Sequence, residues 1–456
     1  MMRGKKLKIF FSGIAGSGVS AIAAFMADKG QMIAGSDRAF DLNPDHPLKK
    51  TFQSKNITIV PQDGSGLDSS FDLAVFSTAV ESDRPEVLKA RSLGVPIKTR
   101  PEYLAEITAS FDTIAVAGTS GKSTTSGLLA FLMKGLGLRP NFIGGGRVKQ
   151  FKSPSNPGNS LTGDSELLVI EACESDGTIV NYRPHHSIIL NLAFDHHSVD
   201  ETARMFETLI HNTGDRIIVS ADDPALGRIT DNKAVAFSIH NPSPYRAEDI
   251  IYRTFSTDFT LKGTKFSLSL PGEYNLYNAL SCIALLSETG TPPDAIAEIL
   301  PLFQGIDRRF DIHLNDGGRL VIDDYAHNPH KIASLMKTLK TLSGSICYIF
   351  QPHGFGPTRM MKKEYIGTFV KHLRGSDHLV LLPIFYAGGT AARDISSHDL
   401  ADGVRSAGRS AEVIEKREDV LKRLHEYADY VILGARDETL SDFAKEIAGA
   451  LVMLKV

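Results

Sequence analysis

The sequence predicts an α/β fold organised in three domains, each built on a mostly parallel sheet. Short apolar runs typical of buried strands alternate with helical stretches along the whole chain. Two glycine-rich turns, at 13–18 and 118–121, each follow such a run and precede a helix. With 456 residues, the chain is too long for one hydrophobic core and requires two or three domains.

Composition excludes several classes of protein. The net charge is −3 and there is no basic tail, so we do not expect nucleic acid as a partner. The three cysteines are widely spaced without a CxxC pair, which suits a reducing compartment and argues against a disulfide framework. The N-terminus resembles a first strand rather than a signal peptide, and no apolar stretch is long enough to span a membrane. We therefore expect a cytoplasmic protein without a membrane partner, as a monomer or weak homodimer.

The first predicted domain, residues 1–107, is Rossmann-like. A strand at 7–11 leads into a turn with glycines at 13, 16 and 18, a helix follows, and a second strand ends at Ser36-Asp37. The glycine order is GxxGxG, whereas the dinucleotide fingerprint is GxGxxG. The turn favours binding of a nucleotide diphosphate, with Asp37 near a ribose or base; a tight turn that binds nothing is the alternative. Thr78 follows a further strand, at the edge where open α/β sheets bind ligands.

The second predicted domain, residues 108–307, resembles a P-loop ATPase. A strand at 113–117 is followed by the turn Gly118-Thr119-Ser120-Gly121-Lys122-Ser123-Thr124 and then a helix. Glycines let backbone N–H groups approach phosphates, and the helix N-terminus favours anions. Lys122 is expected to neutralise the β- and γ-phosphates and the Ser123 hydroxyl to bind Mg²⁺. The first glycine of the full motif falls on Val116, so a turn that merely closes a βα unit is the alternative.

Acidic and histidine side chains follow two further strands of this domain. The strand at 167–170 continues into Glu171, Glu174 and Asp176, and the strand at 187–192 precedes Asp195-His196. Carboxylates at a strand end are candidate Mg²⁺ ligands, although solvated loops carry such acids too. Beyond them, residues 234–270 alternate apolar and polar and suggest appended β-hairpins.

The third predicted domain, residues 308–456, is again Rossmann-like. Arg308-Arg309 lie at its start, where adjacent arginines suit an anion held between domains. Its strands end in polar groups, including Asp324, His327 and His353, at the edge of the sheet where ligands bind.

These motifs, in this order, resemble the Mur ligase superfamily over nearly the whole chain, and its alanine-adding branch most closely. In that family the N-terminal domain holds a UDP-sugar, the central domain ATP, and the C-terminal domain the incoming amino acid. The resemblance implies that the UDP-sugar contacts Gly13, Ala15, Gly16, Ser17, Gly18, Asp37 and Thr78. It implies that ATP contacts Gly118, Thr119, Ser120, Gly121, Lys122, Ser123, Thr124, Asn275, Asn278, Arg308, Asp324 and His327. Ser123, Glu174 and His196 would hold Mg²⁺, and Lys122, Glu174, His196 and His353 would serve catalysis.

One motif departs from the family's pattern. The alanine-adding members usually have Gln-Pro-His-Arg after a third-domain strand, whereas this chain has Gln351-Pro352-His353-Gly354. Arg359 remains nearby, and Arg436 stands where the family usually has glycine. We expect these two arginines to bind the acceptor.

The resemblance implies an ATP-dependent amide ligase of peptidoglycan precursor synthesis. It would join an amino acid, expected to be L-alanine, to the carboxylate of UDP-N-acetylmuramate through an acyl phosphate. A muropeptide-recycling ligase that adds a tripeptide is one alternative, and a non-catalytic nucleotide-binding relative is another. A nicotinamide dehydrogenase would explain the first glycine turn but leaves the phosphate loop without a role.

Overall fold

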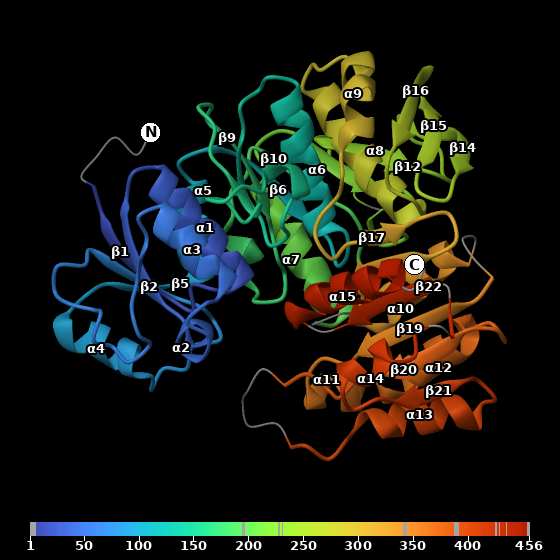
Figure 1. Ribbon diagram of the computed structural model, residues 1–456. Coiled ribbons are helices and arrows are strands. Elements are labelled where there is room, and N and C mark those ends of the chain that lie inside the picture. Colours follow the sequence, from blue (N-terminus) through green and yellow to red (C-terminus); the bar gives the residue numbers. More distant parts are fainter. Residues whose placement is uncertain are drawn as a thin grey trace. The chain divides into compact units, whose positions relative to one another are not determined.

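The computed structural model describes residues 6–193, 197–226, 229, 231–340, 344–386, 392–424, 426–427, 429–434 and 436–453. The chain forms four sheets, and the three large ones are predominantly parallel (Figure 1). The prediction of a three-domain α/β fold is confirmed. The coordinates divide into two compact units, 1–306 and 307–456. None of the helices in the described ranges is long and apolar enough to cross a membrane.

The N-terminal sheet has five parallel strands in the order β3-β2-β1-β4-β5. Because β2 and β4 lie on opposite sides of β1, the sheet's topological switch point is at the carboxyl end of β1, where the first glycine turn begins. Its strands are β1 (Lys8–Ser12), β2 (Met32–Ser36), β3 (Thr58–Ile59), β4 (Leu73–Phe76) and β5 (Ile97–Thr99). Its helices are α1 (Ser17–Asp28), α2 (Arg38–Leu42), α3 (Pro47–Ser54), α4 (Pro85–Leu93) and α5 (Arg100–Thr108).

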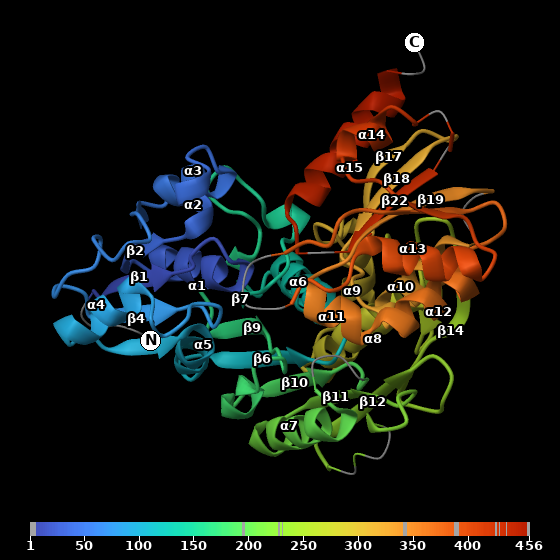
Figure 2. The same cartoon turned by 90° about the horizontal axis from the view of Figure 1, so that it is seen from below.

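The central sheet has eight strands in the order β13-β12-β11-β10-β6-β9-β7-β8, and Figure 2 labels those from β12 to β7. Within this sheet β8 runs antiparallel to its neighbour β7 and the other pairs are parallel. Its strands are β6 (Asp112–Ala117), β7 (Asn141–Ile143), β8 (Ser160–Leu161), β9 (Leu167–Glu171), β10 (His186–Ile189), β11 (Ile217–Ser220), β12 (Ala234–Ser238) and β13 (Tyr245–Arg246). The helices of this part are α6 (Lys122–Gly135), α7 (Val199–Asn212), α8 (Glu273–Glu288) and α9 (Pro293–Ile299).

Helices α6 and α8 pack against each other over one face of the central sheet. The other face shares a hydrophobic core with the N-terminal sheet and α1, in which Phe25 and Ile170 are both fully buried. The first two domains therefore form one compact unit.

The hairpin prediction for 234–270 is correct for its second part only. Strands β14 (Glu248–Tyr252), β15 (Thr257–Leu261) and β16 (Thr264–Leu268) form a small antiparallel sheet. Lys262 and Gly263, both with positive φ, make the tight turn between β15 and β16. Residues 234–238 instead form β12 of the central sheet, because parallel pairing with β11 buries Phe237.

The C-terminal sheet has the order β17-β18-β22-β19-β20-β21, with β17 antiparallel to β18 and the other pairs parallel. Its strands are β17 (Asp311–Asn315), β18 (Leu320–Asp324), β19 (Ile346–Gln351), β20 (His378–Leu381), β21 (Ala411–Val413) and β22 (Asp429–Gly434). Its helices are α10 (Pro329–Leu339), α11 (Phe355–Met360), α12 (Lys362–His372), α13 (Ser397–Ser406), α14 (Arg417–Leu421) and α15 (Thr439–Met453).

Candidate functional site

The predicted phosphate loop connects the carboxyl end of β6 to the first residue of α6. Gly118 and Gly121 have φ values of +139° and +89°, a backbone conformation that residues other than glycine rarely adopt. A Cβ atom on Gly121 would lie 2.5 Å from Oδ1 of Asn278. The loop therefore requires glycine both for its backbone conformation and for its close packing.

Two polar side chains fix the middle of this loop. Oδ1 of Asn191 accepts a hydrogen bond from the Ser120 N–H at 2.8 Å, and its Nδ2 donates to the Ser120 carbonyl at 3.0 Å. The Thr119 hydroxyl donates to the Ala193 carbonyl and accepts from the Ala193 N–H. Asn191 was not among the predicted site residues, because the predicted strand at 187–192 included it, whereas β10 ends at Ile189 and leaves Asn191 in the loop that follows.

Lys122 is held by anionic partners at the base of the loop. Its Nζ lies 2.8 and 3.1 Å from the two carboxylate oxygens of Glu174 and donates to the Gly118 carbonyl at 2.6 Å. The Lys122 and Glu174 side chains are only 10% and 3% exposed. Burial by itself lowers the pKa of Lys122, but the neighbouring Cys173, Glu174 and Glu171 outweigh this effect and hold it above its usual value. Lys122 is therefore a fixed positive charge.

Glu171 belongs to the acidic segment predicted to bind Mg²⁺, although Glu174 was the predicted ligand there. Oγ of Ser123 donates to both Glu171 carboxylate oxygens at 3.0 Å, and the Gly145 N–H donates to one of them at 2.9 Å. Glu171 ends β9 directly opposite Val116 of β6. The predicted magnesium ligand Ser123 thus lies beside Glu171, whereas Glu174 faces Lys122.

This arrangement suits a metal–nucleotide complex. Two carboxylates and a hydroxyl form an oxygen-rich group of the kind that Mg²⁺ prefers, and one lysine leaves the group with a net negative charge. The free N–H groups at the start of α6 suit phosphate oxygens. The third predicted metal ligand, His196, lies outside the described residues. Its neighbour His197 is described, and its Nε2 lies 3.3 Å from the Ser175 carbonyl.

The two asparagines predicted to contact adenine lie at the start of α8, beside the phosphate loop. Asn278 is buried and its Nδ2 is 3.4 Å from Oδ1 of Asn275, whose own Nδ2 donates to the Pro271 carbonyl. Tyr277, between them, donates to Asp222 at 2.8 Å. Backbone hydrogen bonds from 239–241 keep the pKa of Asp222 below its usual value, although burial acts in the opposite direction.

The first glycine turn is closed by Asp37. One carboxylate oxygen of Asp37 accepts the Ala15 N–H at 2.8 Å, and the other caps α2 by accepting the Ala39 N–H at 2.9 Å. Gly13 has φ +77°, and a Cβ atom there would lie 2.9 Å from Cβ of Ser77. Asp37 is thus a structural part of this turn. Thr78 is exposed just beyond β4.

Arg100 connects this turn to the acidic segment of the central domain. A Cβ atom on Gly18, in the first turn of α1, would lie 3.2 Å from Cδ of Arg100. Nη2 of Arg100 lies 2.6 Å from Asp176, and the Ser17 carbonyl accepts a hydrogen bond from Asn159. The predicted residues Ser17 and Gly18 therefore lie at the junction of the first two domains.

Known proteins match each of the three parts of the chain. Residues 8–112 match the Mur ligase family catalytic domain, 116–286 the Mur ligase middle domain, and 308–446 the Mur ligase glutamate ligase domain. A UDP-N-acetylmuramate–L-alanine ligase from Burkholderia multivorans is 33% identical over 91% of this chain and 90% of its own. One from Arthrobacter sp. (strain FB24) is 31% identical over 88% of this chain and 86% of its own.

The chain belongs to the Mur ligase family. Mur ligases are ATP-dependent, and the chain is therefore an ATP-dependent ligase. The crystal structure of a UDP-N-acetylmuramate–alanine ligase from Thermotoga maritima covers 99% of this chain and all of its own, with a TM-score of 0.81 and 27% identity. A murein peptide ligase from Psychrobacter arcticus shares the fold with a TM-score of 0.70, at 22% identity and 98% coverage of both chains.

In this Mur ligase, Arg308 lies in a buried ion pair of the C-terminal domain. Its Nε is 3.2 Å from Asp323, which is fully buried, and its Nη1 donates to the Asp437 carbonyl. Burial raises the pKa of Asp323 to about 7, against the opposing effect of Arg308. Arg309 is only partly buried, with its guanidinium 4.8 Å from the centre of the Tyr325 ring. The contact of Arg308 with ATP remains a prediction.

The predicted motif residues after β18 are also held inside this domain. Asp324 is buried and accepts the N–H groups of Phe310 and Ala326, each at 2.7 Å. Nδ1 of His327 lies 2.9 Å from the Tyr325 carbonyl. Their contact with the nucleotide likewise remains a prediction.

The predicted acceptor-binding residues lie after β19 and β22. Nδ1 of His353 is buried and has no hydrogen-bond partner among the described residues. Burial lowers the pKa of His353, and the charge of Arg436 lowers it further, so the ring is neutral near pH 7. The Arg359 guanidinium forms an ion pair with Asp394. Arg436 is exposed and forms no ion pair within the described part of the chain.

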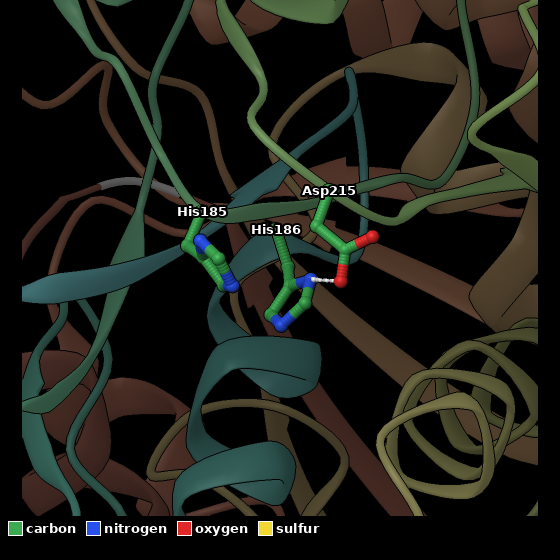
Figure 3. Close-up of side chains that lie close together, drawn as sticks. All are labelled: His185, His186 and Asp215. Atoms are coloured by element: carbon green, nitrogen blue, oxygen red, sulfur yellow. Dashed lines mark ion pairs between the residues drawn. The ribbon is translucent and has the colours of Figure 1, made fainter.

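A separate cluster of His185, His186 and Asp215 lies at the start of β10, at the opposite sheet edge from the phosphate loop (Figure 3). The Arg216 N–H donates to Nδ1 of His186 at 3.2 Å, and the Arg216 guanidinium lies 3.7 Å from Asp215. The two imidazole rings pack edge to face. Since an arginine already occupies this corner, we interpret it as a hydrogen-bonded junction between β10 and β11 rather than a metal centre.

Proposed function

We propose that this Mur ligase joins L-alanine to the carboxylate of UDP-N-acetylmuramate, with hydrolysis of ATP to ADP and phosphate. The observation that carries the proposal is the buried Lys122 in a glycine loop beside Glu171 and Glu174. The relatives named for this reaction match nearly the whole chain.

The reaction has two steps, and the first requires neutralisation of the negative charge on the phosphates. A carboxylate oxygen of the sugar attacks the γ-phosphorus, ADP leaves, and an acyl phosphate forms; such transfer depends on positioning and charge neutralisation. Lys122 and the N–H groups of the loop would neutralise the phosphates. Mg²⁺, held by Ser123 with Glu171 or Glu174, would add further positive charge when bound.

The second step forms the amide. The amine nitrogen of the acceptor attacks the acyl carbon and forms the C–N bond. The bond between the acyl carbon and the phosphate oxygen breaks, and inorganic phosphate leaves with that electron pair. The attacking amine must lose a proton, and the neutral His353 can accept it. Exclusion of water protects the acyl phosphate from hydrolysis.

Phosphate release tests this function directly. The protein is mixed with ATP, Mg²⁺ and UDP-N-acetylmuramate, and each of a panel of amino acids and peptides is added in turn. Release that requires both the sugar nucleotide and L-alanine supports the proposal. Release with a tripeptide alone would instead favour a recycling ligase, and no release with any acceptor would favour a non-catalytic nucleotide binder.

Replacement of Lys122 tests the phosphate loop. Lys122→Ala should abolish phosphate release while circular dichroism shows the fold retained, because no other described cation contacts Gly118 or Glu174 through a hydrogen bond. Lys134→Ala, on the far turn of the same helix α6, is the matched control. Ligase activity in Lys122→Ala would refute the assignment of the loop.

A further inference from the structure

An arginine lies over two aromatic rings at the carboxyl edge of the C-terminal sheet. Phe355 follows β19 and Tyr386 follows β20, and their rings meet edge to face with centroids 5.5 Å apart. The guanidinium carbon of Arg393 is 4.5 Å from the Tyr386 centroid and 5.8 Å from the Phe355 centroid. We call Phe355, Tyr386 and Arg393 the arginine–aromatic cluster.

The donors of Arg393 are available to a ligand. Arg393 is exposed, and within the described residues it forms no ion pair. Stacking on aromatic rings orients a guanidinium without using its N–H groups. A planar fork of N–H donors matches the two oxygens of a carboxylate.

Arg359, one of the two arginines expected from the sequence to bind the acceptor, contacts the residues on both sides of Arg393. Its Nη2 donates to the Ala392 carbonyl at 2.8 Å and also pairs with the Asp394 carboxylate. With its guanidinium engaged in this way, Arg359 is suited to positioning Arg393.

The cluster shares its two strand ends with the candidate proton acceptor. His353 and Phe385 pair in a parallel bridge, and their rings stack 5.8 Å apart. Phe355 is two residues beyond His353, and Tyr386 is the residue after Phe385. Between His353 and Phe355, Gly354 has φ +73°, which favours glycine at the position where an arginine was expected from the family's pattern.

We propose that Arg393 binds the α-carboxylate of the acceptor amino acid and that Arg359 is its positioning residue. This proposal rests on the proposed function. The carboxylate and amine of an α-amino acid are attached to the same carbon atom. An acceptor whose carboxylate is held by Arg393 would therefore carry its amine toward the strand ends where His353 lies.

Steady-state kinetics of Arg393→Gln tests the proposal. We expect the KM for L-alanine to rise at least tenfold, with the KM for ATP and for UDP-N-acetylmuramate unchanged. L-Alaninamide lacks the carboxylate, so its KM should be the same in Arg393→Gln and in the natural protein. Arg359→Gln should raise the KM for L-alanine by a smaller factor, and Arg405→Gln, in an exposed ion pair on α13, is the matched control.

An unchanged KM for L-alanine in Arg393→Gln would overturn the proposal. So would an equal rise for L-alanine and L-alaninamide, because the effect would then not depend on the carboxylate. Acyl phosphate formation needs no acceptor, so its trapping with hydroxylamine should be unaffected in Arg393→Gln. Loss of this partial reaction would indicate general damage and would also contradict the assignment.

The two proposals can fail separately. If the natural protein turns over only with another amino acid or a peptide, the L-alanine assignment fails, and the variants are compared with that acceptor. A rise in KM confined to that acceptor would then support Arg393, and no rise would refute it. If no acceptor supports turnover, both proposals are wrong.

Discussion

Two glutamates three residues apart have different partners in the phosphate loop. Glu171 accepts from the Ser123 hydroxyl, and Glu174 pairs with Lys122. Their contributions to metal binding should therefore be separable by substitution, even though both belong to one acidic segment.

Glu171→Gln should raise the Mg²⁺ concentration needed for half-maximal activity by about tenfold or more. Glutamine can still accept the Ser123 hydrogen bond, but it removes the negative charge that a hard divalent cation prefers. Phosphate release is measured over a Mg²⁺ titration at saturating ATP. Exposed Glu298 on α9 offers a control, Glu298→Gln, and an unaltered Mg²⁺ requirement in Glu171→Gln would count against a metal role.

His186 should make the protein sensitive to acid. Burial, together with the neighbouring His185, lowers the pKa of His186 to about 4. The pKa of His186 in the folded protein is below its unfolded value of about 6.5. The contribution of the neutral His186 ring to the free energy of unfolding is therefore fully present above pH 6.5. It is lost as the pH falls toward 4, at a cost of at most about 3 kcal/mol.

His186→Asn keeps an acceptor for the Arg216 N–H but does not titrate in this range. The free energy of unfolding, measured by urea denaturation from pH 7 to pH 4, should therefore fall less in this variant than in the natural protein. His185→Asn, at the exposed neighbouring position, removes one of the two causes that lower the pKa of His186, so it should reduce the fall by a smaller amount. Parallel profiles for His186→Asn and the natural protein would contradict the lowered pKa.

At the scale of elements, the close approach of α8 to the phosphate loop depends on Gly121. Gly121→Ala would place a Cβ atom 2.5 Å from the Asn278 amide, in addition to the strain of φ +89°. We expect the KM for ATP to rise at least tenfold. Gly137→Ala, just after the same helix, has φ +77° but open space around it, so it carries the strain without the clash.

Comparison of the two alanine variants separates strain from contact. A similar effect of both on the KM for ATP would mean that the approach to Asn278 has no part in nucleotide binding. Because Asn278 is itself predicted to contact ATP, adding Asn278→Ala to Gly121→Ala should raise the KM for ATP by less than the product of the two single effects if the contact matters.

The pattern of elements could be predicted from the sequence, but the pairing of charged groups could not. The apolar runs identified β1, β6 and β9 within about one residue, because each is a short buried run next to a turn. The lysine of the phosphate loop was predicted from local spacing. Its partner Glu174 and the neighbour Glu171 are distinguished only by side-chain direction at the end of β9, which depends on three-dimensional packing.

The same limit applies to the arginines. Arg308 belongs to a conspicuous basic pair in the sequence. The structure nevertheless buries its side chain against Asp323, which lies 15 residues further along the chain, on β18. Arg393 carries no local motif, and only the meeting of the β19 and β20 ends places it over Phe355 and Tyr386. Long-range contacts of this kind leave no periodic signal.

At the scale of the larger compact unit, the first two domains are linked through Arg100 and Asp176. Their side chains are 20% and 15% exposed and meet at 2.6 Å. This pair joins the first turn of α1 to the acidic segment that follows β9, so it should couple sugar-nucleotide binding to the arrangement of the ATP site.

A double-mutant cycle tests this coupling. Arg100→Gln and Asp176→Asn should each raise the KM for UDP-N-acetylmuramate, and the double variant should raise it by less than their product, with a coupling of about 1 to 3 kcal/mol. The exposed pair Lys98–Glu106, which connects β5 to α5, provides a control cycle, with coupling near zero. Independent effects of the Arg100 and Asp176 substitutions would refute the link.

The ion pair between Lys122 and Glu174 means that the Glu174 carboxylate competes with any other anion for Lys122. A nucleotide that binds Lys122 as proposed would have to displace the Glu174 carboxylate, so part of its attraction to the lysine would be offset. As the product nucleotide dissociated, the Glu174 carboxylate could pair with Lys122 again. If Lys122 binds the phosphates as proposed, this competition should speed the release of ADP, often the slow step of such turnover, and should weaken the initial binding of ATP.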